Sequence, residues 1–163
     1  MKKINFYWIF IIIVAESISA SETTLLGYWL TSESIVQIKH CENELCAQIE
    51  DIFVKEGVDP KSILDSNNSN PELQSRSLIG INLFEGFKKD IDVNKNIKGG
   101  RIYSPKEGKF FKAKLSLLKN GDLKVEGCVL FICDGEEWRP LIVTINPDGS
   151  HTAVLKNATE SNF

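Results

Sequence analysis

Apolar and polar residues alternate along most of the chain, which is the pattern of β-strands with one buried face. The clearest case is 111–117, where every second residue is apolar, and a second alternating run follows at 123–127. Between these runs, Asn120-Gly121 has the sequence of a two-residue type I′ turn. The two runs therefore predict a β-hairpin.

The same alternation predicts further strands at 25–30, 35–40, 45–54, 78–87 and 100–103. In the fourth of these, Ile79, Ile81 and Leu83 are expected to share one face. No long apolar stripe of helical period occurs after residue 20. We therefore expect an all-β fold. Antiparallel strands in meander order close most simply into an up-and-down barrel without open edges, and a two-sheet sandwich is the alternative.

Two segments depart from this regular pattern. Residues 55–76 form a long polar insertion. Loops of that length without regular structure are commonly functional or mobile. Residues 141–163 follow the last barrel strand, and Asn146-Pro147-Asp148-Gly149 lies between two apolar runs. This turn sequence predicts a C-terminal hairpin or a strand lying along the barrel.

Oxygen-bearing side chains cluster in the polar insertion, at Asp65, Asn67 and Asn70. Carboxylate and amide oxygens are calcium ligands, but the glycine and glutamate that an EF-hand loop requires are absent at the matching positions. Asp and Asn also hold turns by bonding to neighbouring backbone groups, which is the interpretation we favour. Arg76, at the end of the insertion, is a candidate for contact with a ligand.

The N-terminus has the organisation of a signal peptide. Lys2 and Lys3 precede the apolar run 9–15, and Ser19-Ala20 supplies the small residues of a cleavage site. The run is too short for a permanent span, which needs about 20 residues. We expect residues 1–20 to be removed near Ala20, leaving 21–163 as a single periplasmic or secreted domain with no stable membrane span.

Charge limits the partners of the mature chain. The full sequence has 19 basic and 22 acidic residues, and removal of Lys2, Lys3 and Glu16 leaves 17 and 21, a net charge of −4. Such a chain lacks the basic field that attracts nucleic acid or an anionic membrane surface. We expect neither as a partner.

All four cysteines lie in the predicted exported part, as Cys41-x4-Cys46 and Cys128-x4-Cys133. An even number in an oxidising compartment favours disulfides, and two local bridges are the preferred pairing, although pairing between the clusters is also open. A four-thiolate zinc site is the competing interpretation. The absence of C-x-x-C argues against a redox enzyme.

The chain offers little for catalysis. His40 and His151 are the only histidines, and neither G-x-S-x-G nor H-E-x-x-H occurs. Glu136 and Glu137 are adjacent in an expected strand and so face opposite sides. We therefore expect no enzyme activity, no catalytic residues, no metal and no cofactor.

Several short motifs together resemble one protein family. In chain order they are Gly27-Tyr28-Trp29, Cys41 with Leu45-Cys46, Asp65-x-x-Asn68-x-Asn70-Pro71-x-Leu73-x-x-Arg76-x-Leu78-x-Gly80, Gly99-Gly100-x-Ile102-Tyr103-x-Pro105-x-x-Gly108-Lys109, Leu123-x-Val125-x-Gly127 and Trp138-Arg139. Their combination resembles the DUF2147 family of exported bacterial proteins of unknown function, over residues 27–139. The resemblance implies a lipocalin-like barrel.

Gly27-x-Trp29 also resembles the opening motif of lipocalins, in which the tryptophan closes one barrel end and stacks against an arginine of the last strand. Arg139 is the expected partner of Trp29, and we interpret this pair as barrel closure.

Two functions follow from a lipocalin-like barrel. The first is a carrier or sensor of a small apolar ligand in the cell envelope, and the second is a protein-interaction or inhibitor module with a packed interior. The candidate residues for a lined interior are Ile38, Leu83, Phe111, Leu115 and Val125.

Overall fold

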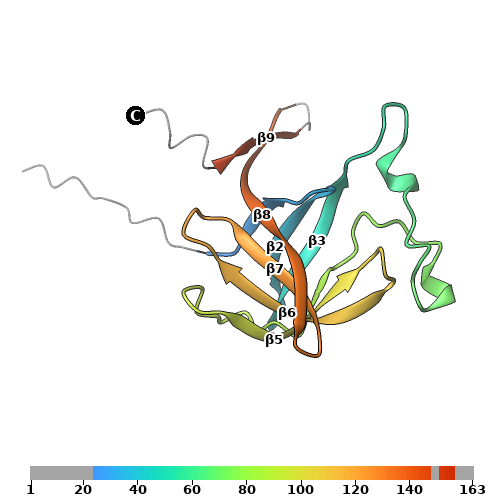
Figure 1. Cartoon of the computed structure of the whole chain (residues 1–163). Helices are drawn as coiled ribbons and strands as arrows, with labels where there is room; N and C mark the ends of the chain where they lie inside the picture. The colour runs from blue at the N-terminus through green and yellow to red at the C-terminus, as the bar shows by residue number, and fades with distance from the viewer. Residues whose placement is uncertain (1–23, 148–150, 157–163) are drawn as a thin grey trace, which may run out of the picture.

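The computed structural model describes residues 24–147 and 151–156 (Figure 1). Its strands are β1 (Gly27–Leu30), β2 (Ser34–Cys41), β3 (Glu44–Ile52), β4 (Phe84–Glu85), β5 (Ile97–Ser104), β6 (Lys109–Leu117), β7 (Leu123–Val129), β8 (Ile132–Ile145) and β9 (His151–Leu155), with short 3-10 helices η1 (Pro60–Ser62) and η2 (Pro71–Leu73). The predicted all-β fold is confirmed. Within the described ranges, no helix has the length and apolar character needed to cross a bilayer. The predicted signal peptide lies outside the described residues.

The strands form one antiparallel sheet in the order β3-β2-β1-β8-β7-β6-β5-β4. Strands that follow one another in the chain pair with each other, apart from β3 and β4, which stand at the two ends of this order. β1 also pairs with β8 and so brings the first and last barrel strands together. The predicted up-and-down barrel is confirmed. Closure between β3 and β4 is irregular: the backbone N–H of Leu83 donates to the Ala47 carbonyl at 2.7 Å, and that of Leu45 to the Phe87 carbonyl at 2.8 Å.

The predicted strand 78–87 is regular only at Phe84–Glu85, so this prediction was too long. Ile81 and Leu83 are buried on one face as expected, whereas Ile79 is half-buried. Two features interrupt the strand. Gly80 has φ 88°, and the Asn82 side chain takes a backbone role by accepting from the Ala47 N–H at 2.8 Å.

The β6–β7 hairpin is confirmed, but its turn is not type I′. Leu117 pairs with Leu123, so residues 118–122 form the connection. Gly121 has φ 86°, whereas Asn120 is not among the residues with positive φ, and a type I′ turn requires positive φ at both central positions.

The predicted C-terminal hairpin is confirmed. β8 continues to Ile145 and pairs with β9, with Ile145 opposite His151. Asp148 and Gly149 of the predicted turn lie outside the described residues.

Both local disulfides are present, which confirms the preferred pairing. Cys41–Cys46 crosses the β2–β3 hairpin, and Cys128–Cys133 joins directly opposed residues of β7 and β8. β2 runs away from the β1–β2 loop while β7 runs toward it, so the two bridges lie at opposite ends of the barrel.

Candidate ligand-binding cavity

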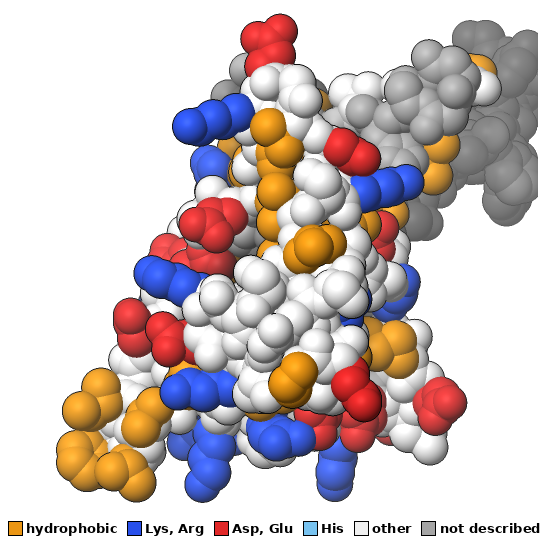
Figure 2. Space-filling view, turned by 90° about the vertical axis from the view of Figure 1, so that its right-hand side faces the viewer, with side chains coloured by type: hydrophobic (Ala, Val, Ile, Leu, Met, Phe, Trp, Pro, Cys, Tyr) orange, Lys and Arg blue, Asp and Glu red, His pale blue; other side chains and the backbone are white. Residues whose placement is uncertain are grey.

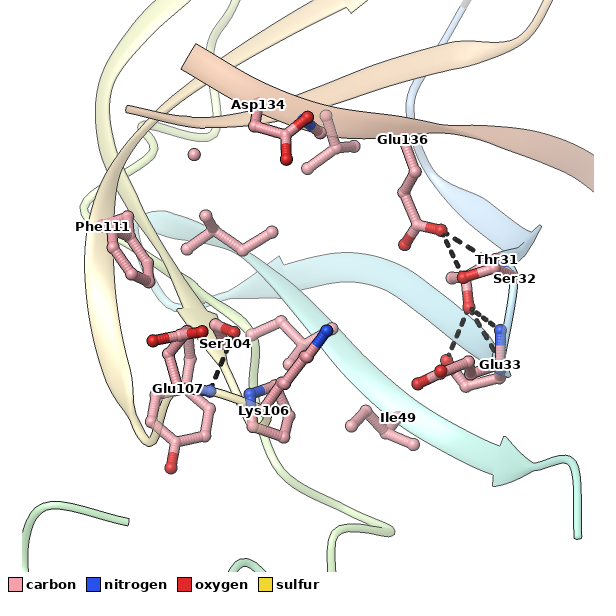
Figure 3. Close-up of a pocket in the computed structure, with 18 of the residues that line it drawn as sticks. Thr31, Ser32, Glu33, Ile49, Ser104, Lys106, Glu107, Phe111, Asp134 and Glu136 are labelled. Atoms are coloured by element: carbon pink, nitrogen blue, oxygen red, sulfur yellow. Dashed lines mark hydrogen bonds between the residues drawn. The ribbon is translucent and has the colours of Figure 1, made fainter. Parts of the chain in front are cut away.

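A cavity of about 760 Å³ opens at the barrel end formed by the β1–β2 loop, the β5–β6 turn and the β7–β8 turn (Figure 3). This volume is in the range of small-molecule sites, roughly 300 to 1,000 Å³. The other half of the barrel is filled by a buried core that includes Ile38, Leu45, Leu115 and Leu123. The interior is therefore open at one end and packed at the other.

Aromatic side chains connect the cavity to the packed half. The ring of Trp138 stacks on Phe84 with centroids 5.7 Å apart and an interplanar angle of 6°, and Phe84 contacts Phe87 at 5.0 Å. All three rings are buried, and Trp138 is the one of them that lines the cavity, where it forms part of the floor.

Apolar side chains from six segments of the chain make the cavity walls. Those lining it are Ile49, Ile52, Leu78, Leu83, Ile102, Phe111, Val125, Val129 and Ile132. Val125 and Val129 share one face of β7 by strand alternation, whereas the β2–β3 register shift allows both Ile49 and Ile52 to line the cavity. Such walls favour a ligand with an apolar body.

Both carboxylate oxygens of Glu136, which lines the cavity, accept hydrogen bonds. Its Oε1 accepts from the Trp138 indole N–H at 2.9 Å, and its Oε2 accepts from the Ser32 backbone N–H at 3.1 Å and hydroxyl at 2.7 Å. Figure 3 shows these contacts to Ser32. The carboxylate thus joins β8 to the β1–β2 loop and fixes the indole of the floor.

The remaining charged groups form a rim of both signs. Lys106 and Glu107 lie in the β5–β6 turn and Lys109 begins β6. Glu33 lies in the β1–β2 loop, and Asp134 comes from β8 on the opposite wall (Figure 3). The Lys109 ammonium lies over the Phe111 ring at 5.3 Å. The cavity therefore combines apolar walls with a polar mouth, which suits an amphiphilic ligand.

The long loop between β3 and β4 is fastened beside this mouth by a buried aspartate. Asp65 is 1% exposed. Its Oδ1 accepts from the Tyr103 hydroxyl at 2.6 Å, and its Oδ2 from Asn68 Nδ2 at 2.7 Å and from Arg76 Nε at 3.0 Å. Arg76 Nη2 also contacts Oδ2 at 2.9 Å, and its guanidinium lies over the Tyr103 ring at 5.9 Å.

Burial, reinforced by the neighbouring Asp65 carboxylate, raises the pKa of Tyr103 to about 12. The hydroxyl therefore stays protonated near neutral pH and keeps donating to Asp65. Because Tyr103 belongs to β5 and lines the cavity, this bond ties the loop directly to the barrel wall.

A second set of bonds joins the loop to the β5–β6 turn. Asn67 Nδ2 donates to the carbonyls of Pro105 and Lys106, at 3.4 and 3.2 Å, and the Ser69 N–H donates to the Gly108 carbonyl at 3.0 Å. Asn70 Oδ1 accepts from the Glu72 N–H at the start of η2. Asn70 thus holds a local turn, as the favoured interpretation expects, whereas Asn67 bonds to a turn distant in the chain and Asp65 to side chains.

The five interior candidates separate into two groups. Leu83, Phe111 and Val125 line the cavity, whereas Ile38 and Leu115 are buried in the packed half. Arg76 is paired with Asp65 and is not among the cavity-lining residues. His40 is exposed on β2.

The expected closure pair is replaced by other contacts. Trp29 is 3% exposed, and its indole N–H donates to the Leu25 carbonyl at 2.9 Å. Arg139 is exposed because it follows the inward-facing Trp138 and so points outward. Among the described residues, the cation–π contacts involve Arg76, Arg101 and Lys109, so the predicted stack of Arg139 on Trp29 is not observed.

Sequence reasoning missed the polar part of the site. Asp134, Glu136 and Trp138 share one face of β8, and all three line the cavity. The period-two rule placed Glu136 and Glu137 on opposite faces but did not show which face is interior. The inward tryptophan two residues later was the available signal.

A barrel that is open at one end, lined there by apolar walls and packed at the other end has the architecture of a lipocalin-like protein. A solved structure described as protein HP1028 from the human pathogen Helicobacter pylori, belonging to the lipocalin family, is similar to this chain, with a TM-score of 0.61 and 23% identity. The similarity covers 74% of this chain and 84% of that chain, and it shows the fold. A comparison with curated proteins returns no match.

The family model described as "Uncharacterized protein conserved in bacteria (DUF2147)" matches residues 27–139. The chain belongs to this family.

Proposed function

We propose that this protein is an exported carrier that holds a small amphiphilic molecule, with its apolar body in the cavity and its polar end at the mouth. The observation that supports this most is the cavity of about 760 Å³, with aliphatic walls above an aromatic floor. The rim, with charges of both signs and hydroxyls such as Ser104, can satisfy a polar head group.

Export to the periplasm or beyond is part of this proposal. It is supported by the signal-peptide pattern of residues 1–20 and by the two disulfides, which persist in oxidising compartments. We further propose binding without chemical conversion of the ligand. In support, the fixed carboxylate of the cavity, Glu136, accepts hydrogen bonds from Ser32 and Trp138, a structural role.

Gly127 offers a way to block the cavity from within. It lines the cavity, and an added Cβ would meet Phe111 Cβ at 3.4 Å and Ile102 Cγ2 at 3.6 Å, which are ordinary contacts. Gly127→Ala should therefore fit, whereas the longer side chain of Gly127→Leu must occupy ligand space. We expect Gly127→Leu to weaken binding of the neutral fluorophore Nile red by about tenfold or more, and Gly127→Ala to change it little.

The natural occupant is sought by native mass spectrometry of the protein exported to a bacterial periplasm and purified without detergent. Additional mass that leaves on collisional activation, and that Gly127→Leu abolishes, is the expected result. A bare protein that also fails to bind Nile red would refute the carrier and favour the protein-interaction module.

A further inference from the structure

The β7–β8 turn carries an apolar tip that the cavity alone does not explain. Val129, Leu130, Phe131 and Ile132 are consecutive, and Leu130 and Phe131 are 88% and 89% exposed. The turns of the β2–β3, β5–β6 and β6–β7 hairpins consist, apart from Leu118, of polar residues, glycine and proline. In Figure 2 an apolar cluster projects from the lower corner of the molecule, the end at which the β7–β8 turn lies in Figure 1.

The tip is held in a fixed shape. Cys128–Cys133 joins the last residue pair before it, and Val129 pairs with Ile132. Leu130 has φ 55°, a left-handed conformation that Gly, Asn or Asp adopts at lower cost. A bulky apolar residue therefore stands where turn chemistry favours a small or polar one, which indicates a role beyond forming the turn.

We propose that this tip inserts into the surface of a lipid bilayer composed of zwitterionic lipids. A narrow convex hairpin matches a fluid surface that deforms around it. The paired strands satisfy the hydrogen bonds of the backbone next to the tip, which matters because unpaired polar groups are costly in hydrocarbon. Leu130 and Phe131 supply the apolar area.

The surroundings of the tip fit the head groups of such lipids. Val129 and Ile132 line the cavity together with two lysines, Lys106 and Lys109, and four carboxylates, those of Glu33, Glu107, Asp134 and Glu136. Lysines pair with head-group phosphates and carboxylates with the cationic groups of the same head groups, which favours zwitterionic lipids, and the excess of carboxylates disfavours anionic lipids. Insertion of the tip would also place the cavity mouth against the bilayer.

Flotation with vesicles of phosphatidylcholine and phosphatidylethanolamine tests this docking. The mature protein should bind, and added salt should change the binding little, because apolar insertion is screened far less than charge attraction. The double variant Leu130→Ser/Phe131→Ser should bind about a hundredfold more weakly, since each exposed apolar side chain that leaves water is worth on the order of tenfold.

Ile145→Ser is the matched control, because Ile145 is 67% exposed at the distant end of β8 and should leave binding unchanged. Near-ultraviolet circular dichroism establishes that each variant is folded. As a second measurement, Phe131→Trp should show a blue-shifted tryptophan emission on vesicles, with quenching by brominated lipid, whereas Ile145→Trp should not.

The proposal is overturned if the protein does not float with the vesicles, or if Ile145→Ser loses as much binding as Leu130→Ser/Phe131→Ser. A dimer in analytical ultracentrifugation that Leu130→Ser/Phe131→Ser abolishes, without vesicle binding, would instead assign the tip to a second copy of the chain. Gly127→Leu separates this proposal from the carrier function: it should lose Nile red and still float with vesicles.

Discussion

Removal of the Asp65 carboxylate should destabilise the protein because three donors, two in the long loop and one on β5, lose this acceptor. In Asp65→Ala, the Tyr103 hydroxyl, the Asn68 amide and the Arg76 guanidinium lose bonds of 2.6 to 3.0 Å. Breaking a buried ion pair costs roughly 3–5 kcal/mol. The Asp65 side chain is fully buried, but that of Arg76 is 38% exposed and can regain water. We therefore expect the free energy of unfolding to fall by about 3 kcal/mol, the lower end of that range.

Urea unfolding followed by tryptophan fluorescence measures this loss, because Trp29 and Trp138 both lie in the core. Amide hydrogen exchange across residues 64–78 shows whether the long loop is released from the barrel before global unfolding. Asp90→Ala is the control, since it removes the same charge from an exposed position, and it should change stability by no more than about 0.5 kcal/mol. If Asp65→Ala is as stable as Asp90→Ala and its loop exchanges no faster, the network does not fasten the loop.

The raised pKa of Tyr103 predicts that the protein loses stability at alkaline pH. The protonated hydroxyl is favoured in the folded state, so the stabilisation that this group contributes is complete below pH 10 and is lost as pH rises toward about 12. Urea unfolding at increasing pH should show this loss in the unaltered protein and not in Tyr103→Phe; identical pH profiles would contradict the assignment. Gly108→Ala should free the loop from the β5–β6 turn, because Gly108 has φ 64° and a Cβ there would lie 1.6 Å from the Asn67 carbonyl oxygen. Faster hydrogen exchange of the Ser69 amide is the expected result. Unchanged exchange would show that the loop and the β5–β6 turn accommodate the added Cβ without weakening their contact.

The sequence was sufficient for the architecture because most barrel strands have their own period-two pattern. Apolar residues at alternate positions of 111–117 and 123–127 predicted the β6–β7 hairpin, and the spacing of Cys41 with Cys46 favoured the disulfide that the structure contains. Patterns of this kind are local, since burial of one strand face is encoded within the strand itself.

The local sequence pattern did not predict where a side chain from a distant segment takes the place of a backbone hydrogen-bond partner. Asn82 accepts the Ala47 N–H in place of a ladder bond, so the predicted strand 78–87 became irregular. The stack expected of Arg139 on Trp29 is not observed, because alternation places Arg139 outside once Trp138 faces inward. The first outcome depended on a contact between segments far apart in the chain, and the second on which face of β8 is interior, which the alternation alone does not specify.

The sequence by itself therefore determined the strands, most of their faces and the family to which the chain belongs. Only the tertiary structure decided which apolar residues pack and which surround open space. Leu115 and Val125 are opposed on neighbouring strands with the same alternation, yet only Val125 lines the cavity. The physical reason is that a cavity is the volume left over after side chains from all strands have been placed, and no single strand encodes that volume.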